Sequence, residues 1–188
     1  MIDKRDIIKA KKKFRKMVNS LNEELKHKNF SSEDDIIIER ILKTEQYKKS
    51  DIILIYYPMY NEVNTLPLIA KAMYDKKRVG IPKIVEGKMH FVELDNNWEK
   101  ELTINKYGIE EPNSNEFMDS FENTLMIVPN LALSRDKKRI GHGKGYYDIF
   151  LEDHNSIFKM GICRKHVLFD TLPVDENDKD LDLVISSV

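Results

Sequence analysis

The sequence has little cysteine, little net charge and no long apolar run, and each shortage excludes a class of protein. Cys163 is the only cysteine, so no internal disulfide can form, and no paired Cys and His spacing suggests a zinc site. The formal net charge of -1 argues against a protein-wide field for nucleic acid or membranes. No run approaches the roughly 18 apolar residues of a membrane span, and the N-terminus lacks the apolar core of a signal peptide. We therefore expect a cytoplasmic protein.

The rest of the composition is that of an ordinary globular protein. Of the 188 residues, 41% are hydrophobic and 34% are charged. A chain of this length can bury a proper core, and we expect one domain over residues 1–188. The charge is uneven, because every charged side chain from Lys4 to Lys16 except Asp6 is basic. Such a run is usually a solvated helix face, so a partner for it needs further evidence.

The pattern of apolar residues predicts helices and buried strands in alternation. Helical spacing predicts one helix over 4–26 and a second over 32–49, which begins at a capping Ser32. The runs at 51–58 and 124–129 are continuous and rich in β-branched residues, which is typical of parallel strands buried on both faces. Further strands are expected at 78–82, 90–94, 158–164 and 181–186, and further helices at 65–74 and 146–153. The fold class is therefore α/β, a three-layer, Rossmann-like arrangement with a mostly parallel sheet and helices on both faces.

Three local predictions accompany this assignment. Thr65 should cap the helix at 65–74, whose buried side is expected to include Leu66, Ile69, Ala70 and Met73. Residues 95–123 are polar and weakly periodic, so we expect them to be mostly irregular. The stretch NLALSRDKK, residues 130–138, is expected to be a polar connection.

One segment, RIGHGKGYYD at residues 139–148, combines alternating glycines with cations. Glycine lets the backbone approach a ligand closely, successive N–H groups can bind an anion, and the helix that follows adds positive potential. Arg139 and Lys144 would supply full charges from an exposed loop. The segment lacks the Ser or Thr of a Walker A loop and has the wrong spacing for a dinucleotide fingerprint. It is either an anion site or a flexible structural turn.

Asp148 and Lys11 can each be interpreted together with that segment. Asp148 closes it, and a carboxylate near a phosphate site suits Mg²⁺, although an Asp is also favoured in the first turn of any helix. Lys11 lies in the apolar stripe of the first predicted helix, with Arg15 one turn later. A lysine there either extends out along its methylenes or points at something anionic.

The stretch VPNLALSRDKKRIGHGKGYYDIFL resembles the signature of the 5-formyltetrahydrofolate cyclo-ligase family. Three other stretches agree with that family in order and spacing: KAKKKFR near the N-terminus, YYPMYNEVNT after the first strand, and LPVDENDKDLDLVIS at the end. Together they cover nearly the whole chain. Two features depart from the commoner pattern: Leu133 and Ser134 replace an aromatic and an acid, and His142 stands where Arg or Tyr is frequent.

The resemblance implies a nucleotide site, a folate site and two metal ligands. ATP is expected to contact Lys11, Arg15, Arg139, Gly141, His142, Gly143, Lys144, Gly145, Tyr146 and Tyr147. The folate substrate is expected at Tyr57, Glu62, Tyr107, His142 and Tyr146. Mg²⁺ is expected at Asp148 and Asp178, whereas Asp175, Asp180 and Asp182 are expected to be turn or solvent acids. From the residues themselves, Glu62 and Tyr57 could equally be a loop acid and an aromatic at the end of a strand.

The family reaction would convert 5-formyltetrahydrofolate and ATP into 5,10-methenyltetrahydrofolate, ADP and phosphate. Transfer of the γ-phosphoryl group to the formyl oxygen makes a leaving group that N10 can displace, so no protein nucleophile is needed. Catalysis would then depend on positioning and on neutralising phosphoryl charge, with Arg139 and Lys144 as the catalytic residues. Cys163 lies in an apolar strand and is expected to be core. We expect a monomer with a small-molecule folate substrate and no nucleic-acid or membrane partner.

Two other hypotheses fit parts of the sequence. A sugar-phosphate isomerase would use the same anion loop but needs a general base, for which Glu62 is the one candidate. A small RNA-binding module would use the basic first helix, and its binding would be lost on neutralising Lys9, Lys12, Lys13 and Lys16. The chain lacks the aromatic platform that such modules carry.

Overall fold

A six-stranded sheet forms the centre of the protein. The computed structural model describes residues 4–105, 108–175 and 178–188. The strand order is β11-β9-β6-β1-β2-β3, and every neighbouring pair is parallel except β2 and β3. The six strands are β1 (Ile52–Ile55), β2 (Arg78–Val85), β3 (Lys88–Glu93), β6 (Thr124–Val128), β9 (Phe158–Cys163) and β11 (Leu183–Ser186). The mostly parallel sheet predicted from the continuous apolar runs is confirmed.

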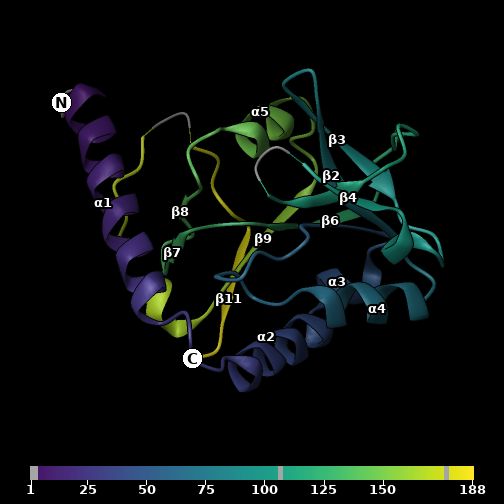
Figure 1. The fold of residues 1–188 in the computed structure, drawn as a ribbon, viewed down its shortest axis with the longest axis horizontal. Helices are drawn as coiled ribbons and strands as arrows, with labels where there is room; N and C mark the ends of the chain where they lie inside the picture. The colour runs from purple at the N-terminus through teal and green to yellow at the C-terminus, as the bar shows by residue number, and fades with distance from the viewer. Residues whose placement is uncertain (1–3, 106–107, 176–177) are drawn as a thin grey trace.

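Helices lie on both sides of this sheet, as Figure 1 shows, with α5 above it and α2, α3 and α4 below it in that view. The first helix, α1, runs along one side of the molecule. The α-helices in the described residues are α1 (Lys4–Glu24), α2 (Ser31–Lys43), α3 (Glu45–Lys49), α4 (Leu66–Tyr74) and α5 (Tyr146–Asp153). None of the helices in the described ranges has both the length and the apolar character that crossing a membrane requires.

The side chains of β1 show why its sequence is apolar at every position. Ile53 and Ile55 belong to the core beneath α2, α3 and α4, whereas Ile52 and Leu54 belong to the core beneath α1 and α5. Successive side chains of a strand point to opposite faces, so a strand covered on both sides needs apolar residues throughout. The two cores make the protein a three-layer α/β structure, as predicted.

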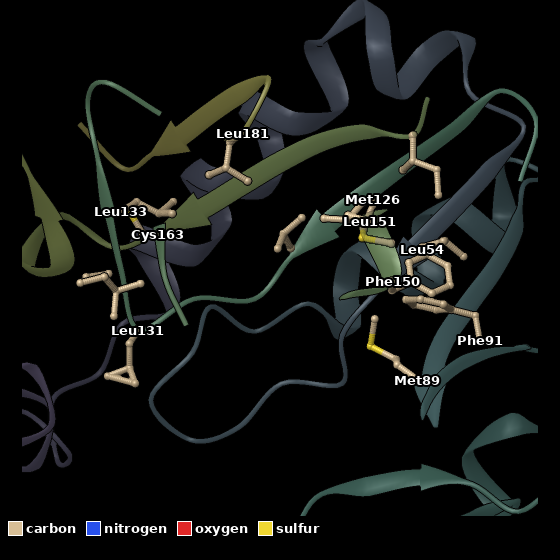
Figure 2. Close-up of a cluster of buried hydrophobic side chains, with 14 of the residues drawn as sticks. Leu54, Met89, Phe91, Met126, Leu131, Leu133, Phe150, Leu151, Cys163 and Leu181 are labelled. Atoms are coloured by element: carbon tan, nitrogen blue, oxygen red, sulfur yellow. The ribbon is translucent and has the colours of Figure 1, made fainter. Parts of the chain in front are cut away.

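The core on the α5 side is the one drawn in Figure 2. It brings Leu54 of β1, Phe91 of β3 and Phe150 of α5 together. The rings of Phe91 and Phe150 meet edge to face with their centroids 5.1 Å apart, a favoured aromatic geometry. This packing fixes α5, and with it the glycine segment that precedes the helix, against the sheet.

Short strands outside the main sheet were not all foreseen. The stretch expected to be a polar connection contains β7 (Ala132–Ser134), which pairs with β8 (Arg139–Ile140) and β10 (Leu168–Phe169) in a second sheet. All three residues of β7 are buried. The segment expected to be irregular is mostly so, but it holds a 3-10 turn (Trp98–Lys100) and the hairpin of β4 (Leu102–Ile104) and β5 (Glu110–Pro112). A second 3-10 turn (Lys165–Val167) precedes β10.

The predicted helix over 32–49 is two helices. Thr44 has extended backbone angles, and its hydroxyl accepts a hydrogen bond from Tyr47 N, so it ends α2 and begins α3. The predicted Ser32 cap is wrong, because no side chain caps the start of α2. Instead, Asn29 Oδ1 accepts a hydrogen bond from the backbone N of Ser31, the first residue of α2.

The helix start at Thr65 is also different from the prediction. Thr65 stands at the N-cap position of α4, but its hydroxyl donates to the carbonyl of Tyr56 rather than capping the helix. That bond ties the start of α4 to the end of β1. The fully buried residues of α4 are Leu68, Ile69 and Ala72, whereas Leu66 and Met73 are half-buried and Ala70 is exposed.

Candidate functional site

A single cavity of about 440 Å³ gathers residues from distant parts of the chain. It lies where β1 and β6 end, which is the usual position of a ligand site in an open parallel sheet. Of the residues that sequence reasoning selected, the cavity is lined by Lys11, Arg15, Tyr57, Glu62, Arg139, Gly141, His142, Gly143, Lys144, Gly145, Tyr146, Tyr147, Asp148 and Asp178. Tyr107 was also selected but lies outside the described residues.

The glycine segment joins β8 to α5 along one wall of this cavity. Gly143 has φ of +99° and Gly145, the N-cap of α5, has φ of +72°, conformations that side chains strongly disfavour. A Cβ on Gly143 would also lie 3.4 Å from the guanidinium carbon of Arg15. The glycines therefore let a turn with positive φ pass close to a cation.

The first helix contacts this segment directly. Arg15 donates from Nε to the carbonyl oxygen of Gly141 at 2.9 Å. Lys11 is only 9% exposed, and its Nζ lies 2.7 Å from Asp175 Oδ2 and 2.5 Å from Asp178 Oδ2. The lysine in the apolar stripe thus points at carboxylates, one of the two outcomes the sequence allowed. Asp175 is consequently an ion-pair partner rather than the solvent acid expected. The other basic residues expected to be solvated are exposed: Lys9, Lys13 and Lys16.

Arg139 is not on an exposed loop, which corrects the expectation. It lies on β8 and is 6% exposed, and its Nη2 lies 2.5 Å from Asp148 Oδ1. Its Nε, like Tyr147 Oη, is buried with no hydrogen-bond partner among the described residues. Buried polar atoms without a partner are costly, and both residues line the cavity, so a polar ligand there would supply what they lack.

The two candidate metal ligands lie near each other. Asp148 Oδ1 is 3.5 Å from the backbone N of Lys179, the residue after Asp178. No cluster of three or more His, Cys, Asp or Glu side chains arranged for a metal occurs in the described ranges. Two carboxylates are nevertheless a sufficient protein share for Mg²⁺, which takes its other ligands from water and phosphate oxygens.

Glu62 lines the cavity from the loop between β1 and α4. This side chain is nearly buried; its Oε2 accepts a hydrogen bond from Met59 N at 2.9 Å, and its Oε1 lies 3.3 Å from His142 Nε2. His142 thus links the glycine segment to Glu62. Burial and the nearby carboxylate of Glu62 raise the pKa of Tyr147, so its hydroxyl stays protonated and available as a donor.

Tyr57 lines the same cavity, at the end of β1. A hydrogen bond with Glu110, together with partial burial, raises the pKa of Tyr57 to about 12. Its ring meets that of Trp98 edge to face, with the centroids 6.3 Å apart. The two contacts fix the ring at the cavity wall.

Sequence reasoning missed part of the lining. One group forms an apolar wall on the antiparallel pair: Pro82, Ile84 and Met89. Another lies on or beside the hairpin of β4 and β5: Asn105, Ile109, Glu110 and Glu111. The remaining members are Tyr56, Met59, Pro129 and Ile140. Polar residues in a weakly periodic stretch gave no signal for this hairpin, whereas Tyr56 and Met59 stand within the YYPMYNE stretch that had already been selected.

Two departures from the family pattern lie in the core instead of the cavity. Leu133 and Ser134 are fully buried in β7. Leu133 packs against Gly161, where an added Cβ would come within 2.9 Å of it, and Ser134 hydrogen-bonds Asp136 across a turn. The expected core position of Cys163 is confirmed, since it is 2% exposed, and burial raises the pKa of its thiol to about 12.

Comparison with known proteins agrees with this architecture. The chain can be superposed on the solution structure of a 5,10-methenyltetrahydrofolate synthetase from Aquifex aeolicus with a TM-score of 0.78, over 94% of this chain and 89% of that one, at 24% sequence identity. A structure of the enzyme of the same name from Mycoplasma pneumoniae gives a TM-score of 0.68 at 21% identity, over 95% of this chain and 99% of the other. These matches support the fold.

Sequence comparison extends to the family. A probable 5-formyltetrahydrofolate cyclo-ligase of Schizosaccharomyces pombe is 33% identical over 94% of this chain and 94% of its own length. A 5-formyltetrahydrofolate cyclo-ligase of Mus musculus is 27% identical over 80% of each chain. The family model matches residues 7–187. The relatives are ligases, which favours an enzyme over an RNA-binding module and a ligase over an isomerase. With nearly its whole length matched, the chain belongs to the 5-formyltetrahydrofolate cyclo-ligase family.

Proposed function

We propose that this protein cyclises 5-formyltetrahydrofolate to 5,10-methenyltetrahydrofolate, using ATP and Mg²⁺ and releasing ADP and phosphate. One observation carries the proposal: a single cavity is lined by the cations, carboxylates and glycines of the nucleotide assignment and by Tyr57 and Glu62 of the folate assignment. Because segments from both ends of the chain line it, we also propose that residues 1–188 act as one domain. We further propose that it works as a cytoplasmic monomer.

The phosphates of ATP would bind at the glycine segment. The buried Nε of Arg139 has no hydrogen-bond partner in the part of the chain that the structure describes. Lys144 and Arg15 line the same cavity, so three cations can neutralise phosphoryl charge. Positive φ at Gly143 and Gly145 allows the backbone to come close to phosphate oxygens. Tyr147 would donate its buried hydroxyl.

Asp148 and Asp178 would hold the magnesium ion. Both are acidic side chains in the cavity, and Lys179 N links their two segments. When bound, Mg²⁺ would supply positive charge that offsets the negative charge of the phosphates. Binding of the ion would release Arg139 from Asp148 and Lys11 from Asp178. Both cations could then turn toward the phosphates, with Lys11 keeping its contact with Asp175.

The reduced pterin of the folate would bind beside Glu62 and Tyr57. Glu62 can accept hydrogen bonds from its amino and ring N–H groups, and Tyr57 can lie against its face. The apolar wall of Pro82, Ile84 and Met89 suits the rest of the ring system. His142 lies between the two substrates, 3.3 Å from Glu62, so binding of the pterin would compete with that contact.

The reaction needs no nucleophile from the protein. The formyl oxygen attacks the γ-phosphorus, the bond to the bridging oxygen breaks, and ADP leaves. N10 then attacks the activated formyl carbon and loses its proton, and phosphate departs with the former formyl oxygen. The side chains of Arg139 and Lys144 hold the phosphoryl group in line with that oxygen and offset its charge, which is catalysis by positioning and preorganised electrostatics.

The test is to add ATP, Mg²⁺ and 5-formyltetrahydrofolate to the purified protein and follow the ultraviolet absorbance of the methenyl product. Product should form only when all three are present. Product without ATP, or none with it, would overturn the proposal. Lys144→Ala should lower turnover by about 10²-fold or more with the fold intact, because Lys144 is exposed.

A further inference from the structure

The ion pair between Asp34 and Arg164 is not part of the cavity, and the proposed reaction does not use it. Asp34 lies on α2 and Arg164 directly follows β9, and they are 6% and 7% exposed. Nε and Nη2 of Arg164 donate to Oδ1 and Oδ2 of Asp34, each at 2.8 Å. A two-point guanidinium–carboxylate contact fixes both planes relative to each other.

The same pair holds the loop between β1 and α4. Arg164 Nη2 donates to the carbonyl oxygen of Glu62 at 2.5 Å, and Asp34 Oδ2 accepts a hydrogen bond from Asn64 N at 3.0 Å. The loop backbone is therefore held on both sides of Val63. One of the two contacts is made by Glu62 itself, whose carboxylate extends into the cavity.

Arg164 is held in turn by aromatic rings. Its guanidinium carbon lies 4.4 Å from the ring centroid of Phe30, and the ring of His166 stacks on Phe30 with the centroids 5.0 Å apart. A guanidinium that donates to both oxygens of a carboxylate and has an aromatic ring against it has little conformational freedom. The position of the Glu62 carbonyl follows from that of Arg164.

Stability alone does not explain a buried pair of this kind. Replacing both partners of such a pair by apolar residues often leaves a protein equally or more stable, since the desolvation cost offsets the attraction. An apolar pair, however, could neither donate to Glu62 O nor accept from Asn64 N. The distinctive contribution of Asp34 and Arg164 is thus the placement of the loop.

We propose that Asp34 and Arg164 are positioning residues for the folate substrate, which hold the Glu62 carboxylate where it meets the reduced pterin. The inference rests on the proposed function, in which Glu62 binds folate. Neither residue shares a hydrogen bond with the glycine segment or with α1 in the described part of the chain. The pair therefore controls folate affinity and leaves ATP affinity unchanged.

The experiment compares KM for 5-formyltetrahydrofolate with KM for ATP, and records the melting temperature of each variant. The main variant is Asp34→Leu with Arg164→Met. It should stay folded, raise KM for the folate roughly 10- to 100-fold, since displacements of about 1 Å can have effects of that size, and leave KM for ATP as it was. Arg164→Lys should raise KM for the folate less, because one ammonium group cannot reproduce the forked contact.

A matched control lies at the other end of the same strand. Lys159, near the start of β9, pairs with Asp182 at 2.8 Å. Lys159→Met also removes a cation from an ion pair on β9 but should change neither KM.

Glu62→Gln measures how far KM for the folate depends on the Glu62 carboxylate itself. If it raises KM for the folate and the folded double variant does not, the positioning role is overturned while the proposed function stands. Equal rises in both KM values would also overturn it, because they indicate a general disturbance. If the double variant does not fold, Arg164→Lys decides by the same comparison. A wild-type protein without cyclisation activity overturns the proposed function and this inference together.

Discussion

Lys11 of α1 and Asp178 near the C-terminus form an ion pair, with Nζ 2.5 Å from Oδ2. In the proposed function Lys11 binds the nucleotide and Asp178 binds the metal ion. The ligand-free protein thus pairs a cation and a carboxylate that each have a different partner in the complex. Arg139 and Asp148 form a second pair of the same kind.

The role of Lys11 can be tested by Lys11→Met, which keeps the length of the side chain. A hydrogen bond to a charged group contributes about 1.5–3 kcal/mol to binding, so its loss should raise KM for ATP roughly 10- to 100-fold. Lys12→Met is the matched control, because Lys12 is the exposed neighbour on the same helix. Steady-state kinetics with saturating folate measures both. Equal effects of the two variants would contradict the assignment.

The role of Asp148 can be tested by Asp148→Asn. The variant should require much more Mg²⁺ for half-maximal activity, since a neutral amide is a weaker ligand for a hard cation. Glu152→Gln is the control, one turn further along α5, where Glu152 is exposed and pairs with Lys179 at 3.6 Å. A Mg²⁺ titration that is unchanged for Asp148→Asn would show that this carboxylate does not hold the ion.

The geometry of the glycine segment predicts a selective effect of Gly143→Ala. Its φ of +99° makes a side chain costly, by about 1–2 kcal/mol, and the new Cβ would lie against Arg15, 3.4 Å from the guanidinium carbon. Turnover should fall strongly. Gly87→Ala carries a similar backbone cost at φ +79°, in the turn between β2 and β3, where a Cβ meets nothing within 4 Å. Gly87→Ala should lower the melting temperature and leave KM for ATP unchanged. A Gly143→Ala enzyme with normal turnover would argue against close phosphate contact.

Stability should depend on pH through His166. Burial, and secondarily the charge of Arg164, lowers its pKa in the folded protein. The unfolded chain, with a pKa of about 6.5, therefore binds the proton more readily. Neutral His166 therefore contributes fully to stability above about pH 6.5. The contribution is lost as the pH falls from about 6.5 toward the lower pKa of His166 in the folded protein. In urea melts, His166→Gln should lose less stability than the wild type between neutral and acidic pH. Parallel losses would contradict this.

Much of the fold was predictable because it follows from local pattern. The continuous apolar run at β1 is required by burial on both faces, and α5 begins at Tyr146 as its sequence predicts. The second sheet was missed because β7, β8 and β10 are only two or three residues long, too short for periodicity to detect. The break at Thr44 was missed because an apolar pattern can continue across a change of helix.

The candidate site was also predictable only in part. Glycines, cations and carboxylates between Arg139 and Asp148 were identified because their types are tied to phosphate chemistry. The burial of Arg139 and its contact with Asp148 depend on β8 pairing with β7, which the sequence did not reveal. The pairing of Asp34 with Arg164 joins residues 130 positions apart and has no local signature.

The proposed reaction depends on activation of the formyl oxygen of the folate by ATP. The most direct measurement uses 5-formyltetrahydrofolate with ¹⁸O in the formyl group, unlabelled ATP and unlabelled water, and analyses the released phosphate by mass spectrometry. The proposed reaction should leave one ¹⁸O in each phosphate released with the methenyl product. Unlabelled phosphate formed together with that product would contradict it.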